Sequence, residues 1–99
     1  MVLEIVQIQI KPGMEAEFEA NFAKALPLYA KAKGWIRTNL QRSIEHPGRY
    51  VALVEWQTVE AHMVDFRESD LFQGFRDLVG HCLDGATIVE HGEQVVAAP

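Results

Sequence analysis

The 99-residue chain has a single cysteine, Cys82, so it cannot form an internal disulfide, and a secreted disulfide scaffold is excluded. It also lacks an apolar run near the ~20 residues that cross a bilayer, and its basic residues are scattered singly rather than clustered as in nucleic-acid-binding proteins. Acidic residues outnumber basic ones by 14 to 9, which gives a net charge of -5. Because no charged and apolar leader opens the sequence, we expect a cytoplasmic protein with no membrane and no nucleic acid among its partners.

Familiar local signatures of catalysis and cofactor binding are missing too. No G-x-G-x-x-G follows a strand-like segment, and there is no phosphate-binding loop, no G-x-S-x-G elbow and no Cys-x-x-Cys pair. No two of the four histidines have metal-ligand spacing, and His62 with Asp65 is only a weak pair. These absences leave open a cofactor held by dispersed residues, but we expect neither a metal nor another cofactor.

The residues that are present indicate one globular domain over residues 2–95, since 48% are hydrophobic and 23% charged. Four segments alternate with a period of two, which is typical of strands. Two longer segments place apolar residues at steps of three and four, as helices do, and Thr58 can cap a short helix between them. The predicted strands span residues 2–10, 35–44, 50–57 and 86–96, and the predicted helices span residues 14–33, 58–66 and 69–84.

Two details of the first helix can be anticipated. Pro27 removes a backbone donor, so we expect a kink or a break near it. Lys31 and Lys33 come late in the helix, where positive charge suits the helix dipole, and Gly34 is a good stop.

The order β-α-β-β-α-β predicts a ferredoxin-like α+β fold, with a four-stranded antiparallel sheet and the helices on one face. The other face of that sheet is apolar, and an exposed apolar face usually marks an interface. We therefore expect a homodimer in which two sheets close into a dimeric α+β barrel. The side chains expected on this open face are Leu3, Ile5, Trp35, Val51 and Leu53.

His62 is the first candidate for chemistry, because it follows the strand that ends in Trp56 and shares a helical side with Phe66. A histidine in an apolar space between helix and sheet can act as a general base near neutral pH. The simpler alternative is a histidine that hydrogen-bonds a backbone carbonyl. His91 follows in the last strand, and the register decides which face it takes.

Arg67 and Arg76 flank the start of the second long helix, where they can pair with Glu68, Asp70 or Asp77, or can bind an anionic or phenolic oxygen. Four aromatic side chains can belong to the core or can line a pocket for a flat aromatic ligand. These are Phe22, Trp56, Phe66 and Phe72. Cys82 is expected to be a buried, inert thiol.

Together, several of these segments resemble the antibiotic biosynthesis monooxygenase domain. The similar stretches are Val54–His62, Phe66–Ser69 with Phe72 and Arg76, Lys11–Gly13, Gly34–Trp35 and Val89–His91, and the resemblance covers roughly residues 2 to 95. It implies dimeric α+β barrels of ferredoxin-like protomers. Some members of the family oxidise polycyclic phenols or quinols with molecular oxygen and no flavin or metal, others cleave haem, and many have no known activity.

The haem-cleaving branch uses an Asn on the first strand and a Trp and a His on the second helical segment. The matching positions here hold Val6, Phe66 and Arg76, and none can serve in the same way, so haem degradation is the less favoured activity.

The cofactor-independent route needs a base, a dry apolar cavity and a donor for a phenolate. For this route the sequence offers His62 as base, Arg67 or Arg76 as donor, and Phe22, Trp56, Phe66, Phe72 and His91 around the substrate. The competing hypothesis is a non-catalytic dimer that binds a small apolar ligand or serves as a stress or accessory module.

Overall fold

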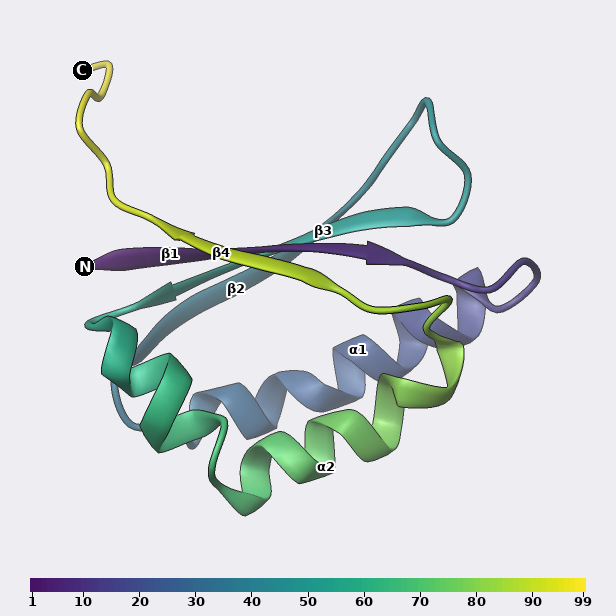
Figure 1. Cartoon of the computed structure of the whole chain (residues 1–99), viewed down its shortest axis with the longest axis horizontal. Helices are drawn as coiled ribbons and strands as arrows, with labels where there is room; N and C mark the ends of the chain where they lie inside the picture. The colour runs from purple at the N-terminus through teal and green to yellow at the C-terminus, as the bar shows by residue number, and fades with distance from the viewer.

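A computed structural model describes all 99 residues, with a sheet on one side and a layer of helices on the other (Figure 1). The strands are antiparallel and lie in the order β2-β3-β1-β4, which confirms the ferredoxin-like α+β prediction. The elements are β1 (Val2–Gln9), α1 (Glu15–Ala30), β2 (Trp35–Arg42), β3 (Arg49–Trp56), η1 (Ala61–Phe66), α2 (Asp70–Val79), η2 (Gly80–Cys82) and β4 (Ile88–Gly92).

The hydrophobic core lies between the sheet and the helices because both strand and helix periodicities point apolar side chains there. Alternate residues of the two central strands, β1 and β3, are buried. In α1 the buried residues are Phe18, Phe22, Ala25 and Tyr29, at steps of three and four. Their rings meet those of Tyr50 and Trp56 on β3, so aromatic contacts connect the two layers.

Helix α1 differs from the expectation in two ways. It runs through Pro27 without a break, because the buried side chains on both sides of Pro27 hold the helix against the sheet. It ends at Ala30, so Lys31 is its C-cap, Lys33 lies beyond it, and the last turn carries no basic residue. The prediction that lysines in the last turn of the helix stabilise its dipole is therefore wrong.

The prediction that Trp35 lies on the open face of the sheet is also wrong. Trp35 pairs with Trp56, whereas Arg37 pairs with Glu55, so β2 carries an extra residue between them. This irregularity turns Trp35 to the helix side. There it packs against the core, and its indole N–H donates to Thr38 Oγ1 at 2.8 Å.

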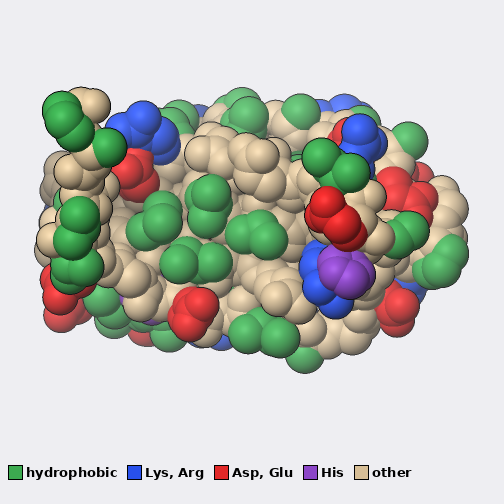
Figure 2. Space-filling view, turned by 90° about the horizontal axis from the view of Figure 1, so that it is seen from above, with side chains coloured by type: hydrophobic (Ala, Val, Ile, Leu, Met, Phe, Trp, Pro, Cys, Tyr) green, Lys and Arg blue, Asp and Glu red, His purple; other side chains and the backbone are tan.

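The other four side chains expected on the open face do lie there. Leu3 and Ile5 alternate with buried residues along β1, and Val51 and Leu53 do so along β3. Figure 2 shows hydrophobic side chains gathered over the middle of this face. No helix combines the length and apolar character that crossing a bilayer requires.

Strand β4 is shorter than expected, since it covers only Ile88–Gly92 rather than residues 86–96. It pairs with the edge of β1, and its register places His91 opposite Glu4. Because Glu4 is on the buried side of β1, His91 faces the helices. The register thus answers the question that the sequence left open for His91.

Candidate functional site

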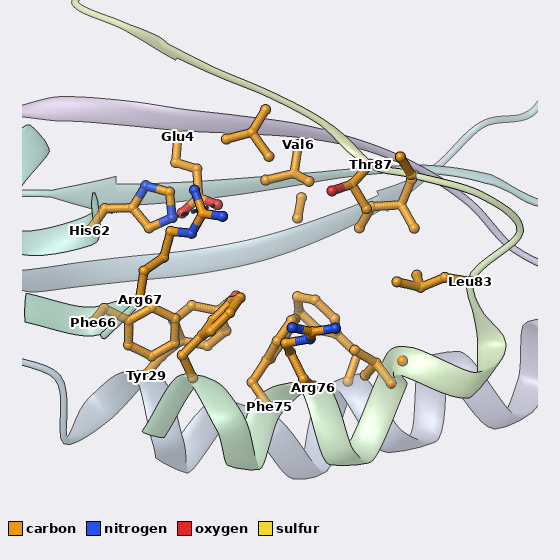
Figure 3. A pocket seen from close by; sticks show the side chains of 18 of the residues that line it. Glu4, Val6, Tyr29, His62, Phe66, Arg67, Phe75, Arg76, Leu83 and Thr87 are labelled. Carbon is orange, nitrogen blue, oxygen red and sulfur yellow. Dashed lines mark ion pairs between the residues drawn. The ribbon is translucent and has the colours of Figure 1, made fainter. Parts of the chain in front are cut away.

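A cavity of about 440 Å³ opens between the sheet and the helices (Figure 3). Polar side chains from β1, η1 and the turn after it stand at one end, namely Glu4, His62 and Arg67. Leu83 and Thr87 line the opposite end. The walls between are largely aromatic, and a small set of polar groups in an apolar pocket is the usual pattern of a small-molecule site.

Glu4 reaches this cavity because of strand periodicity. It occupies the buried side of β1 together with Val6 and Ile8, and only 6% of it is exposed. A carboxyl group in such a place costs free energy unless it has polar partners. The presence of Glu4 on an apolar strand face therefore indicates a functional role for its carboxyl group.

His62 is placed by η1, which is a single π-helical turn. The Ala61 N–H donates to Thr58 Oγ1 at 3.1 Å, as expected from a capping threonine. The Arg67 N–H donates to the His62 carbonyl at 3.0 Å, five residues back, which widens the turn. Such π-turns are frequent at functional sites. Only 3% of His62 is exposed.

The polar end of the cavity holds a chain of contacts through Glu4. The Trp56 indole N–H donates to Glu4 Oε1 at 2.9 Å, and His62 Nε2 lies 3.3 Å from Glu4 Oε2. On its other side, His62 Nδ1 shares a hydrogen bond of 2.8 Å with His91 Nε2. Both oxygens of Glu4 and both ring nitrogens of His62 are therefore engaged. The simpler expectation for His62, a hydrogen bond to a backbone carbonyl, is replaced by these contacts.

The two buried groups have strongly shifted acidities. Burial raises the pKa of Glu4 to about 7, although the hydrogen bond from Trp56 and the charge of Arg67 act in the other direction. Burial, with smaller effects from His91 and Arg67, lowers the pKa of His62 to about 4. At neutral pH the imidazole of His62 is uncharged, and Glu4 is the group that titrates.

Arg67 and Arg76 are exposed side chains on the rim of the cavity. Neither forms a salt bridge with Glu68, Asp70 or Asp77, so the alternative of simple ion pairing is wrong. Arg67 lies with its guanidinium 5.9 Å from the centre of the Phe72 ring and extends toward Glu4 and His62 (Figure 3).

The structure brings together most, but not all, of the residues that the sequence analysis selected. His62, Arg67, Arg76, Phe22, Phe66 and Phe72 line the cavity. Trp56 is fully buried behind Glu4, and His91 lies behind His62, so neither forms the cavity wall. Each acts on the site through a hydrogen bond.

Sequence reasoning missed Glu4, Tyr29 and Phe75 as parts of the cavity. The signal for Glu4 was present, since it is an acidic residue among the apolar residues of one strand face. Tyr29 and Phe75 had no such signal, because aromatic residues at helical spacing are equally typical of a core. Cys82 is buried as predicted, and burial with Glu17 nearby raises its pKa.

Comparison with known proteins identifies close relatives of this fold. The family model described as antibiotic biosynthesis monooxygenase matches residues 1–78. The uncharacterized protein YczJ of Bacillus subtilis is 37% identical over 95 residues, which are 96% of this chain and 100% of YczJ. The crystal structure of a candidate antibiotic biosynthesis monooxygenase from Bordetella bronchiseptica is 47% identical, with a TM-score of 0.94 over 96% of this chain and 97% of that one.

A more distant structure shares the fold alone. SnoaB, a cofactor-independent oxygenase from Streptomyces nogalater, superimposes with a TM-score of 0.79 at 19% identity. The superposition covers 99% of this chain and 96% of SnoaB.

Proposed function

The chain belongs to the antibiotic biosynthesis monooxygenase family, and we propose that it oxidises a quinol or a polycyclic phenol with molecular oxygen and without a cofactor. The observation that carries the proposal is the buried carboxyl group of Glu4, which titrates near neutral pH inside an aromatic cavity. SnoaB, described as a cofactor-independent oxygenase, gives a precedent for cofactor-independent oxygenation on this fold.

We assign the role of general base to Glu4 rather than to His62. A base works best when its pKa is near the working pH, and the pKa of Glu4 is about 7. His62, with its pKa lowered to about 4, is too weak a base. Each of its ring nitrogens has a single bonding site, which is already in contact with Glu4 or His91, whereas each oxygen of Glu4 has a second lone pair that can accept a proton. His62 is then a positioning residue, because its contact with Glu4 Oε2 fixes the orientation of the carboxyl group.

The reaction balances without an added reductant. Glu4 removes the proton from the substrate hydroxyl, and the resulting anion transfers one electron to oxygen. The two radicals combine and form a carbon–oxygen bond at a ring carbon that is conjugated with the hydroxyl oxygen and carries a hydrogen, which lies opposite the hydroxyl in a phenol and next to it in a quinol. The peroxide then takes the proton back from Glu4. Cleavage of the oxygen–oxygen bond, with loss of the hydrogen on that carbon, gives a quinone and one water. The substrate loses two hydrogens and gains one oxygen atom.

The rest of the cavity suits an aromatic anion. Phe22, Phe66 and Phe72 offer flat apolar surfaces and exclude water, which strengthens electrostatic interactions inside. The guanidinium of Arg67 stands on the rim close to Glu4, where it can stabilise a phenolate. Arg76 lies further along the rim and is available to acidic substituents of the substrate.

The proposal is tested by oxygen uptake with a panel of quinols and polycyclic phenols. We expect the variant Glu4→Gln, which keeps an acceptor for Trp56, to lower kcat/KM by about 100-fold or more, as loss of a general base does. The wild-type kcat/KM should rise with pH through about 7, because the base must be deprotonated, and the variant should lack this rise.

Glu19→Gln is the matched control. Glu19 also accepts a hydrogen bond from an aromatic side chain, Tyr50, but it lies outside the cavity, so its loss should leave turnover unchanged. Full activity in Glu4→Gln would refute Glu4 as the base. If His62→Ala rather than Glu4→Gln abolished turnover and the pH dependence, His62 would regain that role.

The same panel separates catalysis from binding. Compounds that raise the melting temperature by mass action but consume no oxygen would favour the alternative of a non-catalytic ligand-binding module. A Soret band on titration with haemin would instead favour haem chemistry. In either function we propose a homodimer joined through the open face of the sheet, on the support of its apolar side chains.

A further inference from the structure

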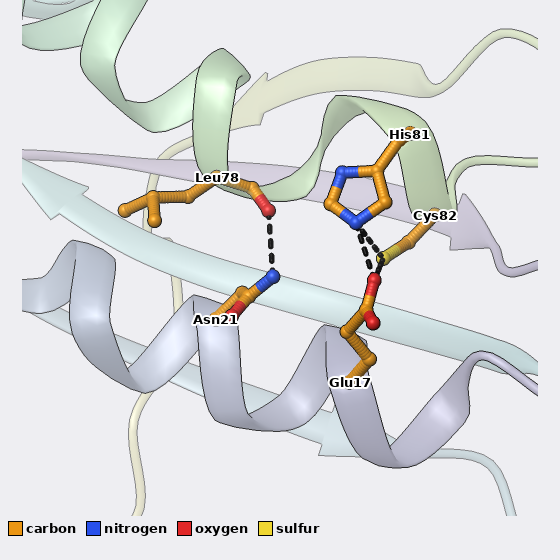
Figure 4. A network of polar contacts seen from close by, with 5 residues as sticks. All are labelled: Glu17, Asn21, Leu78, His81 and Cys82. Carbon is orange, nitrogen blue, oxygen red and sulfur yellow. Dashed lines mark hydrogen bonds and ion pairs between the residues drawn. The ribbon is translucent and has the colours of Figure 1, made fainter.

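A second group of chemically versatile side chains lies apart from Glu4 and His62, where α1 meets η2 (Figure 4). Glu17 extends from the first turns of α1, and His81 and Cys82 are consecutive residues of η2. Cys82 Sγ lies 3.6 Å from His81 Nε2 and 3.7 Å from Glu17 Oε2. His81 Nε2 and Glu17 Oε2 are themselves in contact, so one oxygen, one nitrogen and one sulfur converge.

We propose that Glu17, His81 and Cys82 bind a divalent metal ion of the zinc type. In a tetrahedral zinc site the metal lies about 2.3 Å from sulfur and about 2.0–2.1 Å from nitrogen or oxygen, so a sulfur ligand is separated from its neighbours by about 3.6 Å. The separations of Cys82 Sγ from His81 Nε2 and from Glu17 Oε2 match that spacing.

The third separation requires a small movement. The oxygen of Glu17 and the nitrogen of His81 are in direct contact, which is closer than two ligands of one metal lie to each other. Their side chains are 52% and 50% exposed, so they can part without disturbing the core. Metal binding would replace this one contact with two bonds.

Cys82, in contrast, is held in place by the backbone. The Lys11 N–H donates to the Cys82 carbonyl at 2.9 Å, and the next residue, Leu83, forms a bridge with Ile10. One turn along the helices, Asn21 Nδ2 donates to the Leu78 carbonyl at 2.9 Å, which fixes α1 against α2 (Figure 4). The site therefore has one rigid ligand and two adjustable ones.

The ligand set indicates the class of metal. A thiolate with an imidazole favours Zn²⁺, Co²⁺ and similar ions over Mg²⁺ and Ca²⁺, which prefer oxygen. Three protein ligands leave a fourth position for water, and the exposed side chains of Glu17 and His81 give the ion an entry path. Sequence reasoning had no means to find this site, because Glu17 and His81 are 64 residues apart.

A bound ion would join the start of α1 to the segment after α2. Gly80 and Leu83, on either side of His81 and Cys82, line the far end of the cavity. The metal would thus fix one wall of the cavity and stabilise the fold, whether or not the protein is an oxygenase.

The test uses untagged, chelator-treated protein, with Zn²⁺ added and its stoichiometry measured after dialysis. We expect one Zn²⁺ per chain in the wild type and, at an excess of about 100-fold over the dissociation constant, a rise in melting temperature of roughly 10 °C. His81→Ala and Glu17→Ala replace exposed side chains, so both should fold and both should lose the bound zinc and the rise. His46→Ala, which replaces an exposed histidine in the turn before β3, is the control and should retain them.

Cobalt reports on the sulfur ligand directly. Co²⁺ bound to the wild type should give a near-ultraviolet charge-transfer band from the thiolate, and Cys82→Ser, checked for folding by circular dichroism, should lack this band. Zinc binding that is equal in the wild type, His81→Ala and Glu17→Ala would overturn the proposal. So would a wild type that binds Co²⁺ without the thiolate band, or that binds no metal at all.

Discussion

Burial moves the pKa values of Glu4 and His62 in opposite directions, because it penalises the charged form of each group. Glu4 becomes easier to protonate and His62 harder, although they lie 3.3 Å apart. The sequence analysis selected His62 and missed Glu4, although strand alternation puts Glu4 on the same side of β1 as Val6 and Ile8. The contact between Glu4 and His62 depends on the three-dimensional meeting of β1 and η1, which no local pattern encodes.

These shifts predict two opposing effects of pH on the free energy of unfolding. The folded-state pKa of Glu4 lies above its ordinary value. The stabilisation that Glu4 contributes to the folded state is therefore complete below about pH 4.5 and is lost as the pH rises to about 7. The folded-state pKa of His62 lies below its ordinary value, so its contribution is complete above about pH 6.5 and is lost as the pH falls to about 4. In the wild type the two slopes largely cancel between pH 4.5 and 6.5.

Single variants should reveal each slope. In Glu4→Gln only His62 remains, and we expect stability to fall by up to about 3 kcal/mol as the pH is lowered from 6.5 to 4. In His62→Gln we expect the reverse, a loss of stability as the pH is raised from 4.5 to 7. Urea denaturation midpoints at successive pH values measure both. If the denaturation midpoint changed with pH in the same direction in both variants, the opposite pKa shifts of Glu4 and His62 would be contradicted.

Helix η1 is held next to the sheet by a close backbone approach at Gly34. This glycine has a φ of +80°, and its carbonyl accepts a hydrogen bond of 2.8 Å from the Gln57 N–H at the end of β3. A Cβ atom at this position would lie 2.7 Å from the Cβ of Ala61, the first residue of η1. Any side chain on residue 34 must therefore push η1, and His62 with it, away from Glu4.

We predict that Gly34→Ala lowers the free energy of unfolding by about 2 kcal/mol or more and lowers oxygen uptake as well. Gly13→Ala is the matched control, since Gly13 has a similar φ of +87° but open space around its Cβ position. It should cost about 1 kcal/mol and leave turnover unchanged. Adding Ala61→Gly to Gly34→Ala should restore part of the turnover. Equal effects of the two alanine variants would mean that only backbone strain is involved.

The periodicities of the sequence predicted the elements well, because strands and helices of a two-layer fold each need one buried face. They failed where a single residue changes the register. The extra residue between Trp35 and Arg37 turned Trp35 to the opposite face, and an irregularity of this kind leaves no mark in an alternating pattern. The predicted end of β4 was wrong for another reason, because the length of β4 depends on how far β1 extends beside it.

The fold leaves one face of its sheet without a cover from its own chain. Helices α1 and α2 lie on the opposite side (Figure 1), while Leu3, Ile5, Val51 and Leu53 remain half-buried on the open face. Apolar side chains gathered in this way gain free energy when a second surface removes them from water. A two-fold pairing of identical faces removes the apolar side chains of both chains from water at the same time.

We predict that Leu53→Asp converts a dimer into a monomer. Leu53 is on the central strand β3, between Ile5 and Asn39 of the neighbouring strands, so a carboxylate there would be buried at the middle of the paired sheets. Its side chain is only partly buried in the single chain, and the variant should therefore still fold. Sedimentation equilibrium at micromolar concentration should give twice the 11.2 kDa chain mass for the wild type and for Ala20→Asp, an exposed position on α1 that serves as the control.

The same variant separates assembly from chemistry. The residues of this chain that line the cavity lie on the side of the sheet away from Leu53. Monomeric Leu53→Asp should thus melt at a lower temperature, because β1 and β3 lose their cover, yet keep a KM close to that of the wild type. A monomeric wild type would refute the proposed interface and leave the cavity argument intact. A monomeric variant with no substrate binding would mean that the partner supports the cavity through the sheet.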